Sequence, residues 1–109
     1  MTKYKLNSEQ LDKLIFPYLN STLGGLEKGN LSRMDYWILP DEDNPTFTLT
    51  RTGPASNPNA GINRLGINYE LVSFVKNLYS INAETAMDTI TRWFKHTYKQ
   101  NTHDTHLII

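Results

Sequence analysis

The side chains that could act as acids, bases or nucleophiles are scattered along this chain, and their spacing matches no catalytic arrangement. The 109 residues contain no cysteine, which excludes disulfides, thiolate zinc sites and cysteine nucleophiles. Neither a nucleophile beside a base nor a pair of carboxylates in an apolar setting is visible. Carboxylates such as Asp35 and Glu70 fit the surface of a strand or a helix. We therefore expect a protein that is not an enzyme and carries no cofactor.

Two small groups of side chains carry metal-ligand chemistry. Residues 41–44, DEDN, bring oxygen ligands together as calcium or magnesium requires, but the calcium-loop pattern with a central glycine and a distal glutamate is missing. His103 and His106 could bind zinc with His96 only if this region were helical, and its asparagine and threonine content disfavours a helix. We expect a solvated turn at 41–44 and no metal site.

Anion-binding chemistry is possible before the helix expected at Asn68, where free backbone amides and the helix dipole favour a negative charge. Arg51, Arg64 and Asn68, with the amides of the 53–66 loop, could hold a phosphate or a nucleotide. The spacing matches neither glycine-rich phosphate motif, and the Asn68 side chain can satisfy the helix amides itself. A small-ligand site and an ordinary capped helix both remain open.

Nucleic-acid binding would use the last two expected helices, whose connecting turn from Ser80 to Asn82 is compatible with a helix-turn-helix arrangement. Arg92, Lys95 and Lys99 would then contact phosphates. Eleven basic and eleven acidic residues leave no net charge, however, and acidic side chains near the start of the last helix would face the negatively charged groove. Nucleic acid is therefore the alternative partner and not the leading one.

Local patterns predict three helices. The first starts at an Asn7 N-cap with a glutamine at capping-box spacing, and Pro17 should kink it or end it early. A second helix starts at Asn68 and a third at Asn82, each carrying an apolar stripe at helical spacing. The third should end near Gln100.

Alternation with period two predicts two strands, in 34–39 and 46–52, that form an antiparallel hairpin. Phe47 and Leu49 should point to the core, and the alternating threonines should face solvent or a light cover. The glycine-rich stretch 21–30 predicts a loop.

These elements predict a single compact α+β domain over residues 1–101. Its order is an N-terminal helix, an antiparallel hairpin, a long loop, and two antiparallel C-terminal helices packed on the hairpin. Residues 102–109 should form a C-terminal tail with an apolar tip.

Apolar side chains exceed what one small core should need. The strand with Trp37 and Leu39 already carries apolar side chains on its other face, so one row should face outward. We therefore expect a protein-protein interaction or assembly protein, acting as a homo-oligomer or with a larger partner. The predicted contact residues are Trp37, Leu39, Leu107, Ile108 and Ile109. Alternatively, the tail folds back over the hairpin.

Neither a secretory leader nor an apolar run of the ~20 residues needed to span a membrane is visible. We expect a soluble, cytoplasmic protein with no membrane partner. Abundant asparagine and threonine fit an AT-rich genome, such as that of a phage or mobile element, which would place the protein in the host cytoplasm.

Overall fold

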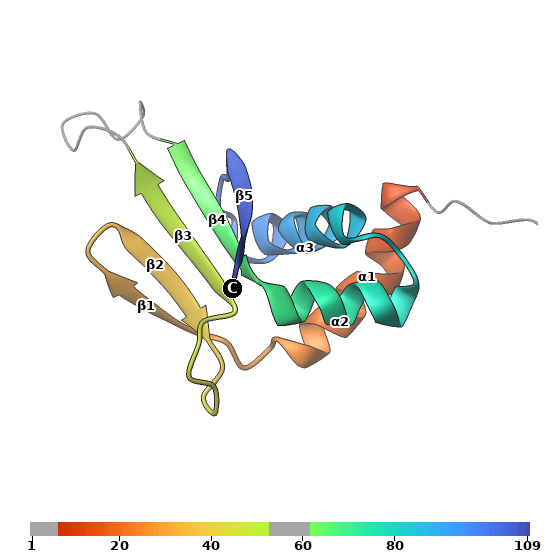
Figure 1. Ribbon diagram of the computed structural model, residues 1–109, viewed down its shortest axis with the longest axis horizontal. Coiled ribbons are helices and arrows are strands. Elements are labelled where there is room, and N and C mark those ends of the chain that lie inside the picture. The colour runs from red at the N-terminus through yellow and green to blue at the C-terminus, as the bar shows by residue number, and fades with distance from the viewer. Residues whose placement is uncertain (1–6, 53–61) are drawn as a thin grey trace, which may run out of the picture.

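The computed structural model describes residues 7–52 and 62–109 as an α+β fold of three helices and five strands (Figure 1). The helices are α1 (Ser8–Thr22), α2 (Tyr69–Tyr79) and α3 (Ala83–Tyr98). The strands are β1 (Glu27–Leu31), β2 (Met34–Ile38), β3 (Phe47–Thr52), β4 (Ile62–Asn68) and β5 (Asp104–Ile108). The predicted α+β class is confirmed, and the sheet is larger than the expected hairpin.

The strands form one sheet in the order β1-β2-β3-β4-β5. The first four strands pair antiparallel, including the predicted β2-β3 hairpin, whereas β5 pairs parallel with β4. A parallel pair needs a crossover, which α2 and α3 provide. Figure 1 shows the three helices gathered on one side of the sheet, with α2 and α3 running in opposite directions.

Each helix begins after the asparagine that the sequence predicts as its cap. The Asn7 side chain accepts from the Gln10 amide while the Gln10 side chain accepts from the Asn7 amide, which completes a capping box. The side chains of Asn68 and Asn82 accept from amides in the first turns of α2 and α3. α3 ends close to the expected position, where Lys99 adopts a left-handed conformation.

The predicted early end at Pro17 was wrong, because α1 continues to Thr22. Proline removes the amide that would bond to the Lys13 carbonyl, four residues earlier. Both residues are exposed, so water can hydrate that carbonyl. On the other side of the helix, Leu19 is fully buried, which favours continuing the helix past the proline.

Aromatic rings fill the core between the sheet and α3. Trp37 is 2% exposed, and its ring meets that of Phe94 edge-on at a centroid distance of 4.8 Å. Phe47 is fully buried beside Trp93 and Phe94, as the sequence predicts for the core face of this strand. The Trp93 indole donates to Asn20 Oδ1 at 2.8 Å. The prediction that Trp37 faces a partner was wrong, because α3 covers the face to which its ring points.

The face of the sheet opposite the helices carries the outward row. Side chains alternate between the two faces of a strand, so the burial of Trp37 turns Met34, Tyr36 and Ile38 to this face, where each is half-buried. Thr48 pairs with Tyr36 in the neighbouring strand and is only 8% exposed. An apolar row therefore does face outward, but it consists of other residues than Trp37 and Leu39.

Three strands lie where the sequence predicts loops or a tail. β1 begins at Glu27 inside the expected 21–30 loop and runs to Leu31, β4 begins at Ile62 inside the expected 53–66 loop, and β5 lies within 102–109. Residues 53–61 of that loop lie outside the described residues. Polar residues are in the majority in β1 and β5, so apolar alternation does not mark these two strands, whereas backbone pairing is available to any sequence. In β4, Leu65 and Ile67 do alternate and are fully buried, but the run is too short to stand out from its polar neighbours. The 102–109 segment is therefore part of the sheet and not a tail beyond a domain ending at 101.

Replacing the buried indole tests the core. We expect Trp37→Ala to lower the free energy of unfolding by about 3–5 kcal/mol, because it leaves a large cavity against α3. Urea denaturation measures this change. The control is Leu14→Ala at a side chain that is 51% exposed, which should cost less than about 1 kcal/mol. Equal losses in the two variants would contradict this account of the core.

A second substitution tests how β5 sits on β4. A Cβ at Gly66 would meet the Thr48 hydroxyl and lie 2.9 Å from Ile108 Cγ1. We expect Gly66→Ala to destabilise the protein by about 1–3 kcal/mol in urea denaturation, because neither neighbour can move freely. Part of the loss should be recovered in a Thr48→Ala background. Gly25→Ala is the control, since nothing lies within 4 Å of its Cβ position, and a similar loss there would refute this packing.

Candidate functional site

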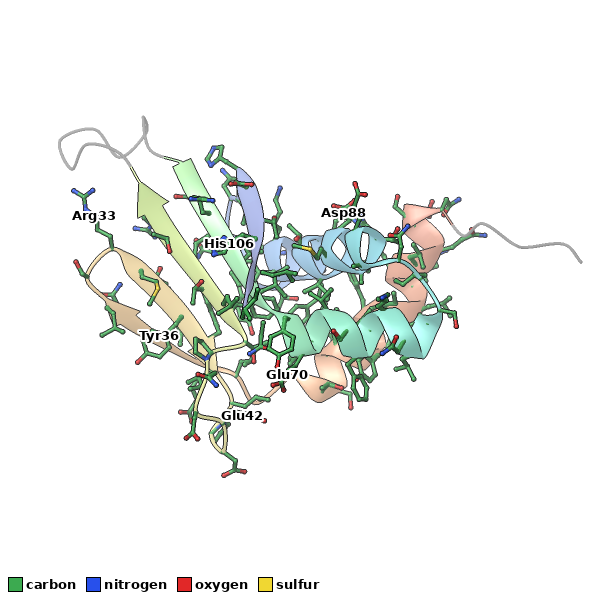
Figure 2. All side chains as sticks on the ribbon, in the orientation of Figure 1. Arg33, Tyr36, Glu42, Glu70, Asp88 and His106 are labelled. Atoms are coloured by element: carbon green, nitrogen blue, oxygen red, sulfur yellow. The ribbon has the colours of Figure 1, made fainter. Side chains whose placement is uncertain are left out.

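Two surfaces of the fold have the character of binding sites, and the first is a cleft beside the start of α2. It has a volume of about 240 Å³ and lies where the end of α1, the β2-β3 loop and the start of α2 meet. Its lining residues are Tyr18, Thr22, Leu23, Leu39, Glu42, Asn44, Thr46, Asn68, Glu70, Leu71 and Phe74. Figure 2 shows Glu42 on the loop and Glu70 near the start of α2.

Asn68 fixes the shape of this cleft. Its backbone amide donates to the Thr46 carbonyl at 2.9 Å, and its side-chain amide donates to the Pro45 carbonyl at 3.4 Å. Its side-chain oxygen accepts from the Glu70 amide at 2.8 Å. One residue therefore joins the β2-β3 loop to the first turn of α2 and sets the distance between the two sides of the cleft.

The lining of the cleft is acidic and partly aromatic. Two carboxylates, Glu42 and Glu70, face it, and none of its lining residues is basic. The rings of Tyr18 and Phe74 stack beside them, with centroids 6.2 Å apart and planes at 6°. The cleft thus offers negative charge beside aromatic and apolar surface.

A tyrosine pair continues the cleft wall along the helices. Tyr79 meets Tyr18 edge-on, and its hydroxyl donates to the Leu14 carbonyl at 3.4 Å. Burial raises the pKa of Tyr79, with a smaller contribution from neighbouring Tyr18. The phenol therefore remains a hydrogen-bond donor at neutral pH and links α2 to α1.

The second surface is the outer edge of β5. Within residues 7–52 and 62–109, no strand pairs with this side of β5. Leu107 is 39% exposed and Ile109 fully exposed, while Ile108 is half-buried over Gly66. Of the predicted contact residues, these three lie together at one edge, whereas Leu39 lines the cleft and Trp37 lies in the core. The five predicted contact residues therefore do not form one surface.

The predicted anion site is not assembled by the fold. Arg51 lies 3.6 Å from Asp35, and Arg64 bonds to Asp104 at 3.2 Å. Both arginines lie toward the end of the sheet where β3 leads to β4, whereas Asn68 lies at the opposite end of β4 and caps α2. The prediction that these three residues could meet one ligand was wrong, because β4 is an extended strand that separates them.

The predicted nucleic-acid contacts differ in their surroundings. Arg92 pairs with Asp12 of α1 at 3.0 Å and also bonds to the Thr89 hydroxyl. Lys95 and Lys99 are exposed near the end of α3. The opposite side of α3 is buried in the core, where it packs against α1, α2 and the rings of Trp37 and Phe47. The nucleic-acid alternative stays a prediction.

No group of three or more metal-ligating side chains occurs among the residues that the structure describes. His103 Nδ1 instead accepts from the Asn63 amide at 3.0 Å. Asp41, Glu42 and Asp43 are exposed in the β2-β3 loop. None of the described helices combines the length and apolar character needed to cross a membrane.

Sequence reasoning considered Glu42 only as a metal ligand and Glu70 only as helix surface. It did not single out Phe74, which lies in the apolar stripe of the second helix. Phe74 is in fact 58% exposed. The one available signal was the width of that stripe, since an amphipathic helix in a small fold seldom buries so broad an apolar face.

Comparisons with protein-family models, curated proteins and solved structures find no match for this chain.

Proposed function

We propose that this protein is a non-catalytic assembly protein whose copies join through the outer edge of β5. The observation that carries this proposal is the outer edge of β5, which pairs with no other strand of residues 7–52 and 62–109 and lies next to exposed Leu107 and Ile109. Unpaired backbone groups at a sheet edge are a template for another strand, and natural proteins usually block such edges with charge or proline. β5 contains no proline, and Asp104, the one residue in it that is always charged at neutral pH, is paired with Arg64 of β4.

The alternation of backbone groups along β5 sets the pairing. The His103 amide donates to the Asn63 carbonyl of the β4 side at 2.8 Å. The Asn68 amide bonds to Thr46 on the β3 side, so the backbone groups of Asn63, Leu65 and Ile67 face β5. In the parallel register of β4 with β5, these groups bond to Asp104, His106 and Ile108, and the amides of Thr105 and Leu107 point outward. Two copies related by a twofold axis at His106 then pair antiparallel and join their sheets into one.

The other edge of the sheet is less suited to this role. β1 carries Glu27 and Lys28, and both are exposed. Charges on an edge strand oppose pairing with another chain. The Lys28 ammonium also lies 5.6 Å from the centre of the Trp37 ring, which ties it to the sheet. Assembly through β5 therefore uses the edge with the fewer charged groups.

The pairing should be weak and reversible. A single short strand buries less area than the ~1,200–2,000 Å² of a stable interface. We expect a monomer-dimer equilibrium that light scattering with size exclusion detects as a mass rising with protein concentration.

Proline in the edge strand tests the backbone contribution. We expect Leu107→Pro to make the protein monomeric at all concentrations, because it removes an outward amide but none that bonds to β4. Leu107→Ala is the matched control and should keep the concentration dependence, since it retains the backbone amide. Thermal melts establish that both variants fold. A monomeric wild-type protein would refute the proposal.

A side-chain change tests the same edge without altering the backbone. We expect Leu107→Lys to shift the equilibrium towards monomer by about tenfold in Kd, because it places charge where an apolar contact would form. Leu31→Lys, on β1, changes a side chain that is also exposed, at 61%, and should leave the equilibrium unchanged. A larger effect of Leu31→Lys than of Leu107→Lys would show that the copies join through β1 and not through β5.

A further inference from the structure

We infer that the cleft beside α2 is a docking site for a segment of a partner protein, which brings an arginine or lysine side chain to Glu42 and Glu70. The neighbouring residues of this segment, being apolar, lie on the adjoining surface of α1 and α2. This surface is separate from the β5 edge, so its partner need not be a second copy of the chain.

Charge selects a cation. Glu42 and Glu70 are the only side chains of Asp, Glu, Lys, Arg or His type that line the cleft, and neither carboxylate has a hydrogen bond or ion pair in the described part of the chain. Glu70 stands in the first turn of α2. A helix N-terminus carries roughly half a unit of positive charge, which one carboxylate more than offsets. The second carboxylate leaves the cleft negative.

The aromatic wall suits the same ligand. Tyr18 and Phe74 present nearly parallel rings beside the carboxylates. Guanidinium and ammonium groups are attracted to aromatic faces within about 6 Å, and their aliphatic stems pack well against apolar surface. Leu23, Leu39 and Leu71 supply that surface within the cleft. An anionic or purely apolar ligand would use only part of this lining.

A strip of exposed apolar side chains leads away from the cleft. Phe74 is 58% exposed, and farther along the two helices Leu78 and Leu14 are 53% and 51% exposed. The bond from the Tyr79 hydroxyl to the Leu14 carbonyl joins the helices that carry them. A free amine would leave this strip in water, whereas a polypeptide with apolar residues beside its basic residue would cover it. The strip therefore favours a protein segment over a small cation.

The experiment uses two short amidated peptides, one with a single arginine between leucines and one with glutamate in its place. We expect the arginine peptide to shift amide resonances of the cleft residues in an NMR titration, and the glutamate peptide to leave them unchanged. Equal binding of the two peptides, or shifts only elsewhere on the protein, would overturn the proposal.

Variants identify the charges responsible. We expect the double variant Glu42→Gln with Glu70→Gln to raise the Kd of the arginine peptide about tenfold, since both partly solvated contacts between a carboxylate and the arginine are lost. Glu84→Gln is the matched control, because Glu84 is also in the first turn of a helix but does not line the cleft. Phe74→Leu keeps an apolar side chain but removes the aromatic ring, and it should raise the Kd of the peptide about threefold. Wild-type affinity in the double variant would overturn the proposal.

Two further measurements distinguish a protein segment from a small cation as the ligand, and this cleft from the β5 edge. Arginine amide alone should bind far more weakly than the peptide, and equal affinity would show a small-cation site instead of a docking surface. The monomeric Leu107→Pro variant should bind the peptide as the wild type does. That result keeps the test of this cleft independent of the assembly proposed for β5, whichever of the two fails.

Discussion

The contact between Trp37 and Phe94 determines how the rest of this fold is arranged. Once the indole packs against α3, alternation along β2 fixes which side chains of that strand face the helices. Residues that lie opposite each other in paired strands point to the same face of the sheet. Phe47 lies opposite Trp37, and Ile67 lies opposite Phe47, so all three face the helices. The two faces of the sheet therefore differ in kind: one is sealed by helices, and the other carries a half-buried row with Tyr36 at its centre.

Much of the helical structure could be predicted from local chemistry. Asn7, Asn68 and Asn82 each satisfy an amide in the first turn of a helix, an interaction that depends on neighbours in the sequence alone. The β2-β3 hairpin was also visible in the alternation of its side chains. The face of the hairpin that turns inward was not, because Tyr36 and Trp37 are both aromatic and only the position of α3 decides between them.

The binding surfaces were harder to predict because they depend on distant segments. The cleft joins residues from α1, the β2-β3 loop and α2, and neither Glu42 nor Glu70 has a local pattern that suggests the other. Leu107 and Ile109 were predicted as contact residues and remain exposed, although they belong to a strand and not to a loose tail. Arg51 and Arg64 were expected to act together, but each has a carboxylate beside it.

The crossover before β5 gives this small protein a long-range step in folding. The contacts that hold β5 against β4, such as that of Arg64 with Asp104, join residues 40 positions apart in the sequence. The chain therefore loses the entropy of closing this long loop before the fifth strand can complete the sheet. During synthesis the four-stranded meander and both later helices emerge before the fifth strand does. In that interval β4 offers its own open side to any strand nearby, including the β5 of another molecule. The same geometry thus provides a route to domain-swapped exchange, with the short segment after Lys99 as the hinge.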